Sequence, residues 1–198
     1  MYEYISGKLT SLNTTQAVID CGGVGYLLEI SLTTFDKIQH LRDTSSPAKL
    51  FVHEVIREDA HQIFGFADEI ERSLFRLLIS VSGVGANTAR VMLSTLTAVE
   101  LSSAIASQDE ATIKRIKGIG AKTAQRIVLE LHDKVATLGT MSAAVGTSTG
   151  MGISISKQEA LSAMTMLGFA KSAVEKVLQT LDGSLTAEEL IREALKKM

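Results

Sequence analysis

The stretch Ser82–Arg90 reads SGVGANTAR, and it returns 35 residues later as Lys117–Gln125, which reads KGIGAKTAQ. In both copies the end of an apolar helical pattern runs into Gly-aliphatic-Gly, and small residues typical of a helix start follow. Because glycine alone reaches positive φ without a Cβ clash, we expect both glycines of each copy to close a tight hairpin between two helices. The repeat therefore predicts tandem helix-hairpin-helix units.

Each predicted turn opens a helix whose first backbone N–H groups have no partner within the helix. Together with the positive end of the helix dipole, these groups favour a bound phosphate. Around the second copy, from residue 111 to residue 129, there are basic side chains and no carboxylate: Lys114, Arg115, Lys117, Lys122 and Arg126. A single such turn could equally be an ordinary helical hairpin with a solvated basic face, but two copies in register favour phosphate binding.

The composition, with 45% hydrophobic and 21% charged residues in a chain of 198, indicates a globular protein with room for several small domains. The net charge is only −2, so any DNA-binding surface must be local. Cys21 is the only cysteine, which excludes an internal disulfide and favours a cytoplasmic protein. We find no secretion-signal pattern and no apolar run of membrane-spanning length, so no membrane association is expected.

Residues 1–66 show the pattern of a small β structure. Short alternating strands are predicted between residues 4 and 30, at Lys49–Ile56 and at His61–Phe66, with a short helix or irregular crossing over Thr33–Leu41. Five short strands with one crossing predict a β barrel of the oligonucleotide-binding (OB) type. The tip of its last hairpin reads Arg57-Glu58-Asp59-Ala60, and polar residues at such a tip are usually just solvated turn residues.

The rest of the chain is predicted to be helical, so the fold class is multi-domain α+β. Residues 67–136 carry the tandem hairpins, and Thr97–Glu100 within them has the spacing of a capping box. The uncharged stretch 137–155 is typical of a flexible linker. Capping-box patterns at Ser156–Glu159 and Thr186–Glu189 predict a three-helix module over 156–198. Its Leu167-Gly168-Phe169 turn resembles that of ubiquitin-associated (UBA) domains, which bind proteins, although these side chains could also simply fill the core.

Motifs of cofactor and metal chemistry are missing from the sequence. Ile116 stands where a P-loop would begin with glycine, so no ATPase loop is present and no cofactor is expected. The histidines have no metal-ligand spacing: His40, His53, His61 and His132. Glu58 and Asp59 could hold a divalent ion as in a nuclease, but no third carboxylate is close in sequence, so we predict neither a metal site nor catalysis.

The chain as a whole resembles the RuvA family of bacterial Holliday junction branch-migration subunits. The resemblance rests on the order of barrel, tandem hairpins and terminal module, and on local sequence. The matching segments are Cys21–Tyr26, Arg57–Ala60, Phe64–Phe66, the two glycine hairpins and Leu190–Leu195. It implies a non-catalytic scaffold that holds a four-way junction open during recombination and DNA repair. It also implies a homotetramer, which can pair into an octamer, and two protein partners: the hexameric RuvB ATPase motor and the RuvC resolvase.

The resemblance also implies roles for particular residues. Glu58 and Asp59 would form an acidic pin near the four-fold axis, where carboxylates repel DNA phosphates. The implied DNA-binding residues lie in and beside the two turns: Gly83, Val84, Gly85, Thr88, Lys117, Gly118, Ile119, Gly120, Lys122, Thr123 and Arg126. The implied motor-binding residues lie in the terminal module: Leu167, Phe169, Ile191 and Leu195. Asn87 departs from the pattern, because a basic residue is often found there, and a weaker first phosphate contact is expected.

Two other functional classes remain as alternatives. A structure-specific nuclease or glycosylase could use helix-hairpin-helix units for nonspecific grip, and it would cleave labelled DNA. A protein-interaction adaptor would not bind DNA with the steep salt dependence that follows from phosphate neutralisation.

Overall fold

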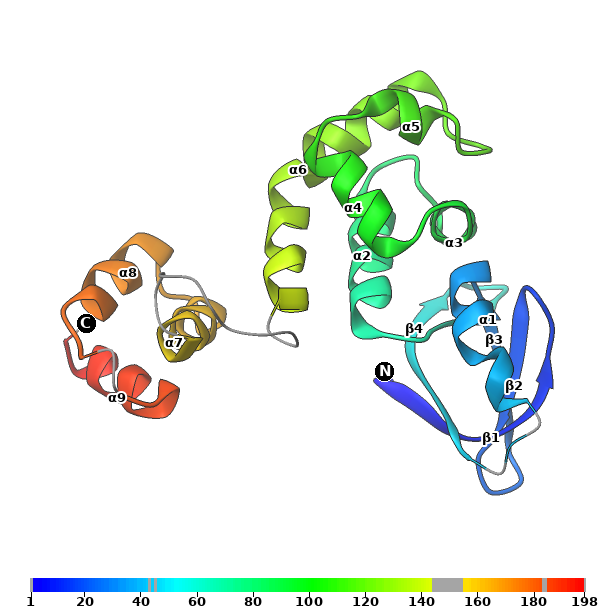
Figure 1. Ribbon diagram of the computed structural model, residues 1–198, viewed down its shortest axis with the longest axis horizontal. Coiled ribbons are helices and arrows are strands. Elements are labelled where there is room, and N and C mark those ends of the chain that lie inside the picture. The colour runs from blue at the N-terminus through cyan, green and yellow to red at the C-terminus, as the bar shows by residue number, and fades with distance from the viewer. Residues whose placement is uncertain (1, 43, 45, 144–154, 183–184, 198) are drawn as a thin grey trace. The chain divides into compact units, whose positions relative to one another are not determined.

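The computed structural model describes residues 2–42, 44, 46–143, 155–182 and 185–197. The chain divides into two compact units, residues 1–147 and residues 148–198 (Figure 1). Each unit has a core of its own, and each is described by itself below.

The first unit begins with a closed β barrel, which confirms the predicted OB-type fold. Around the barrel the strands follow the order β1-β2-β3-β5-β4, and every neighbouring pair is antiparallel except β3 and β5. Alternate side chains such as Ile19, Leu28 and Leu50 fill the interior and are completely buried. The strands are β1 (Tyr4–Leu12), β2 (Gln16–Asp20), β3 (Gly25–Ile30), β4 (Ala48–Ile56) and β5 (His61–Phe66).

The predicted crossing between β3 and β4 is a helix, α1 (Leu32–Ile38), extended by a 3-10 turn, η1 (Gln39–Leu41). The Ser31 side chain caps α1 by accepting a hydrogen bond from the Thr34 N–H at 3.0 Å. The helix places Ile38 in the core of the barrel.

In the described part of the first unit, the helices that follow the barrel carry the two hairpins: α2 (Glu69–Ser80), α3 (Ala86–Thr95), α4 (Ala98–Ala106), α5 (Glu110–Lys114) and α6 (Ala121–Ala143). Their core includes Phe75, Leu101 and Ile127 and continues into the barrel through Phe64 and Phe66. The predicted capping box of Thr97 and Glu100 is present at the start of α4. Helix α6 is longer than expected, since it occupies 137–143, the first part of the predicted linker. The later part, 144–154, lies outside the described residues.

In the described part of the second unit, helices α7 (Ile155–Met166), α8 (Lys171–Gln179) and α9 (Ala187–Lys197) pack around Met164, Val174 and Leu190. Gly168, with a φ of 95°, follows α7 at the predicted turn. Thr186 and Glu189 bond reciprocally before α9, as the capping-box pattern predicted. Ser156 was wrongly predicted to cap α7, because the helix already includes Ile155.

None of the described helices is by itself long and apolar enough to span a membrane.

Candidate nucleic-acid interface

The two hairpin turns have the same backbone hydrogen bonds. In the first turn the Val84 N–H donates to the main-chain oxygen three residues earlier (3.0 Å), and in the second turn Ile119 does the same (3.1 Å). The following helices also begin alike, because the carbonyl oxygens of Gly85 and Gly120 each accept a 2.9 Å hydrogen bond from the N–H of the residue four positions later. The repeated sequence therefore folds into two equivalent turns.

The two glycines of each turn have different roles, which corrects the expectation that both adopt positive φ. Gly83 and Gly118 do, at 93° and 90°. Gly85 has a φ of −85°, an ordinary value for any residue, and Gly120 also lies outside the positive region. A Cβ on Gly85 or Gly120 would meet no atom within 4 Å. The second glycine thus leaves open space in front of the helix start, where a DNA backbone can approach closely.

The aliphatic residue between the glycines faces inward. Val84 is 5% exposed and Ile119 6%, and both belong to the core of the first unit. Their N–H groups are already used within the turns. Val84 and Ile119, implied by the resemblance to touch DNA, therefore support the turns rather than present donors or side chains to a ligand.

Free backbone donors lie at the two helix starts. Helix α3 has no side-chain cap, and the N–H groups of residues 85–88 and 120–123 have no acceptor within the described residues. Thr88 and Thr123 occupy equivalent places, both half-buried. Each start thus offers unpaired donors and the positive end of a helix dipole, the combination that binds phosphate.

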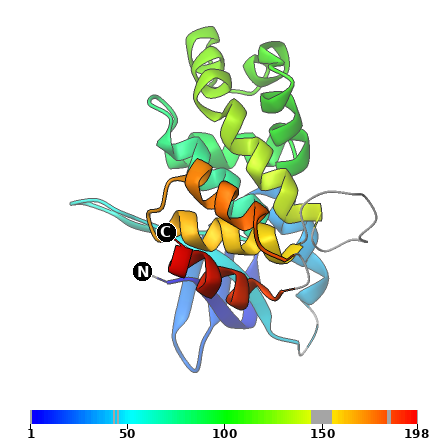
Figure 2. The same ribbon diagram turned by 90° about the vertical axis from the view of Figure 1, so that its left-hand side faces the viewer.

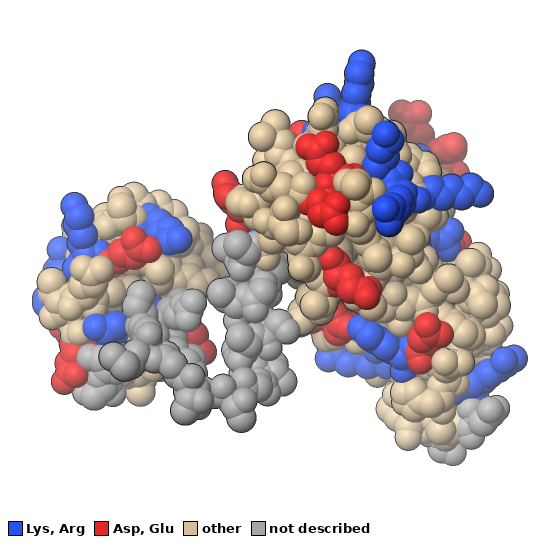
Figure 3. Space-filling model, turned by 45° about the horizontal axis from the view of Figure 1, so that its top comes forward, with Lys and Arg blue, Asp and Glu red and all other residues tan. Residues whose placement is uncertain are grey.

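The second turn carries the excess of positive charge. Lys114, Lys117 and Lys122 are exposed, and within the described ranges none of them forms an ion pair. Lys and Arg side chains gather at the upper end of the larger unit in Figure 3. At the position equivalent to Lys122, the first turn has Asn87, which is also exposed but uncharged. The two turns are alike in backbone and unequal in charge.

Arg126 connects the two turns. Its Nη1 donates a 3.0 Å hydrogen bond to the main-chain oxygen of Ser82, and its Nε lies 3.9 Å from a carboxylate oxygen of Glu130. A Cβ on Gly83 would come within 4.0 Å of the Thr123 hydroxyl oxygen. The turns therefore lie side by side, although 35 residues separate them in sequence. Arg126 was predicted as a phosphate ligand, and its half-exposed side chain also holds the two turns together.

The acidic pair lies at the tip of the β4–β5 hairpin, which projects from the barrel in Figure 2. A 2.8 Å hydrogen bond from the Arg57 N–H to the Ala60 oxygen closes the tip. Glu58 and Asp59 are exposed, and neither forms an ion pair with another described residue. Nearby Ile56 is 71% exposed, a feature that the sequence analysis did not single out. Two uncompensated carboxylates thus stand on a solvated, protruding tip.

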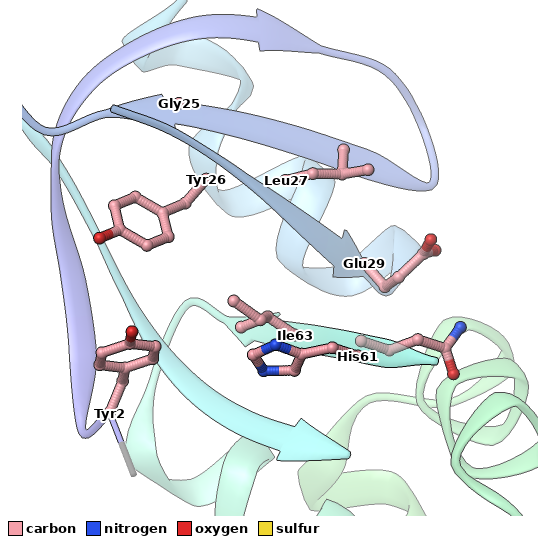
Figure 4. Close-up of a pocket in the computed structure, with 8 residues that line it drawn as sticks. Tyr2, Gly25, Tyr26, Leu27, Glu29, His61 and Ile63 are labelled. Carbon is pink, nitrogen blue, oxygen red and sulfur yellow. The ribbon is translucent and has the colours of Figure 1, made fainter. Parts of the chain in front are cut away.

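A shallow pocket opens in the barrel where β3 and β5 diverge, since these strands pair only at Glu29–Phe64 and Ile30–Gly65 (Figure 4). Tyr2 and Tyr26 line it with their rings in a T-shaped arrangement, 6.1 Å between centroids. None of the predicted site residues lines this pocket. Within the described ranges, no group of three His, Cys, Asp or Glu side chains is placed to hold a metal ion.

The predicted motor-binding residues of the second unit differ in exposure. Leu167 and Leu195 are 66% and 45% exposed, while Phe169 and Ile191 pack partly against the core. Met166, which sequence reasoning missed, is 86% exposed. These exposed apolar side chains are candidates for a contact with another protein.

Comparison with known proteins gives matches over most of the chain. Residues 1–65 match the family described as RuvA N terminal domain, residues 75–133 the SAM-like helix-hairpin-helix tandem, and residues 157–198 the RuvA C-terminal domain. The chain is 43% identical over 205 residues to the Holliday junction branch migration complex subunit RuvA of Bacteroides thetaiotaomicron. The proteins of the same name from Christiangramia forsetii and Parabacteroides distasonis are 46% and 44% identical. All three alignments cover both proteins completely.

Proposed function

This chain belongs to the RuvA family, and we propose that it is the DNA-binding subunit of a Holliday junction branch migration complex. In this role it holds a four-way junction during recombination and repair and does no chemistry itself. The junction is recognised by its shape and its phosphates rather than by base sequence.

The pairing of the two hairpin turns is the observation that carries this proposal. Two helix starts with free donors lie side by side, and Arg126 links them through Ser82. Such a pair can hold phosphates on both strands of one duplex arm. Gly85 and Gly120 leave room for the DNA backbone, and Lys117, Lys122 and Arg126 add positive charge.

The acidic tip supplies selectivity in this proposal. In a homotetramer, which can pair into an octamer, each chain would bring Glu58 and Asp59 to the centre, which makes two carboxylates from each of four chains. Their repulsion of phosphates would disfavour continuous duplex at the centre and favour a junction, whose strands part there.

The second unit is proposed to recruit the RuvB ATPase motor through its exposed apolar side chains, with Leu167 and Leu195 at the contact and Phe169 and Ile191 beneath them. RuvC is the proposed resolvase that acts on the same junction. Because the substrate is chromosomal DNA, the proposed compartment is the cytoplasm. No observation favours the nuclease or glycosylase alternative.

The experiment that tests the proposal compares a labelled four-way junction with a linear duplex of the same arm sequence, by gel shift over a range of salt. We expect junction binding to be much tighter and to weaken steeply with salt. Native mass spectrometry with the junction measures the number of chains bound. Equal affinity for both DNA forms would contradict the proposed function, and cleavage of the junction with Mg²⁺ present would support the enzyme alternative.

A further inference from the structure

A buried carboxylate joins the barrel to the helix that leads into the first hairpin turn. Glu71, in the first turn of α2, is completely buried. Its two carboxylate oxygens accept hydrogen bonds from the hydroxyls of Ser31 and Thr34, which belong to the start of α1. A buried carboxylate is costly unless it is hydrogen-bonded, and here both oxygens are.

The directions of these hydrogen bonds are fixed by the backbone. The Ser31 hydroxyl oxygen already accepts from the Thr34 N–H (3.0 Å), and the Thr34 hydroxyl oxygen accepts from the Ala67 N–H (3.1 Å). Each hydroxyl has one hydrogen, and both hydrogens are directed to Glu71. Because Ala67 directly follows β5, the network ties together α1, the end of β5 and α2. Strand β5 is one arm of the hairpin that carries Glu58 and Asp59.

A second contact joins the barrel to the helix that follows the same turn. Arg90, in α3, donates to a carboxylate oxygen of Glu29 in β3 (2.7 Å) and to the main-chain oxygen of Thr15 (3.1 Å). The Arg90 and Glu29 side chains are each only 20% exposed, which makes this ion pair less screened than one at the open surface. The turn at Gly83 is therefore held between two anchors on the barrel, Glu71 before it and Arg90 after it.

We propose that Glu71 and the Arg90–Glu29 pair are positioning residues for junction selectivity: they fix the acidic tip on the barrel relative to the first phosphate-binding turn. The inference rests on the proposed function and goes beyond it. A linear duplex meets the repulsion of the acidic tip whether or not the tip is in register with the turns. A junction binds well only when its strands part around the tip while its arms lie on the turns, so a displaced tip would repel junction phosphates and loss of the anchors should weaken junction binding alone.

The direction of the change in DNA affinity distinguishes loss of position from a simple effect of charge. Glu71→Gln and Glu29→Ala both remove a negative charge, and a purely electrostatic effect would tighten the binding of every DNA form. Loss of position predicts weaker junction binding instead. Glu69→Gln is the matched control, because it removes the same charge from the same turn of α2 at a side chain that is 62% exposed.

The test measures junction and duplex affinities of the full-length variants at one salt concentration, together with their thermal unfolding. We expect Glu71→Gln and Glu29→Ala to weaken junction binding about tenfold with unchanged duplex affinity, and Glu69→Gln to bind as the wild type does. Ile105→Val, a change in the buried core, is the control for lost stability: it should lower the melting temperature without changing the junction-to-duplex ratio.

The outcomes separate the two proposals. A junction-to-duplex affinity ratio equal to that of the wild type in folded Glu71→Gln and Glu29→Ala proteins would overturn the positioning role. An equal loss of junction affinity in Glu69→Gln or Ile105→Val would overturn it as well. If Glu71→Gln does not fold, Glu29→Ala decides alone, because its side chain is partly exposed. Absence of junction preference in the wild-type protein would instead overturn the proposed function.

Discussion

Arg126 reaches across the paired hairpins to Ser82, with 3.0 Å between its Nη1 and the main-chain oxygen of Ser82. The two residues are 44 positions apart: Ser82 opens the first copy of the repeat, and Arg126 directly follows the second. An arginine in this place contributes its charge to the proposed DNA surface and also links the two hairpin turns by a hydrogen bond. Lys122, exposed and unpaired among the described residues, can contribute only charge.

Replacement of Lys122 and Arg126 should therefore weaken DNA binding to different extents. We expect Lys122→Ala to weaken junction and duplex alike and to reduce the slope of log affinity against log salt by about one, since it removes about one phosphate contact. Arg126→Ala should weaken DNA binding more, because it also removes the hydrogen bond that links the two turns. Filter binding over a salt series measures both quantities. Lys176→Ala, which removes an exposed charge in the second unit, is the control. Unchanged DNA affinity in a protein that carries both Lys122→Ala and Arg126→Ala would contradict the proposed DNA interface.

The two glycines of the second turn should respond differently to substitution. Gly118→Val places a Cβ at a φ of 90°, and strain of about 1–2 kcal/mol should lower the melting temperature as well as DNA affinity. Gly120→Val should leave folding nearly unchanged, because a Cβ there meets no atom within 4 Å, and should impair only DNA binding. Thermal unfolding and gel shift on the same samples test this. Wild-type DNA affinity in Gly120→Val would show that the DNA backbone does not come close at this point.

Removal of the second unit should separate junction binding from motor recruitment. Because α6 extends to Ala143, the truncation belongs after that residue rather than at position 137, where the linker was predicted to start. We expect the shortened chain to keep tetramer formation and junction affinity and to lose stimulation of RuvB. Leu167→Ser, at an exposed side chain, should reproduce the loss of stimulation in the full-length protein. Loss of junction binding on truncation would refute the modular interpretation.

Neutralising the acidic tip should reduce the preference for junctions, chiefly because the affinity for duplex rises. We expect Glu58→Gln combined with Asp59→Asn to raise duplex affinity more than junction affinity, because the repulsion that excludes duplex is removed. Folding should be unaffected, since both side chains are exposed. A duplex and junction titration at matched salt measures the ratio, and an unchanged ratio would exclude a selective role for the tip. The anchoring variants differ, because they should lower junction affinity.

Glu71 should give the stability of the protein a characteristic pH dependence. Burial raises the pKa of Glu71 above 4.5, with a further increase from Asp68, while the Ser31 and Thr34 hydroxyls and Lys37 oppose the shift. A raised folded-state pKa means that the native state binds more protons than the unfolded state between the two values. The free energy of unfolding of the wild type, relative to Glu71→Gln, should therefore fall as pH rises from about 4.5 through the folded pKa. Chemical denaturation of both proteins over this range measures the difference, and a difference that grows with pH would contradict it.

The sequence alone determined the parts of this protein whose signals are local. Glycine spacing, apolar periodicity and capping residues depend on neighbours within a few positions, and they predicted the barrel, the paired Gly-x-Gly turns and the capping boxes at Thr97 and Thr186. Local signals failed at boundaries. The stretch 137–155 was predicted to be a flexible linker because it is uncharged and rich in small residues, yet residues 137–143 continue α6.

Only the tertiary structure decided what depends on residues far apart in the chain. Gly83 and Gly85 are both glycines of the same turn, and the sequence does not distinguish their roles. In the structure Gly83 adopts a positive φ, whereas Gly85 leaves open space where a Cβ would stand. Nothing near Glu71 in sequence indicates burial against hydroxyls 37 and 40 positions away. The link from Arg126 to Ser82 likewise exists only because folding brings the two copies of the repeat side by side.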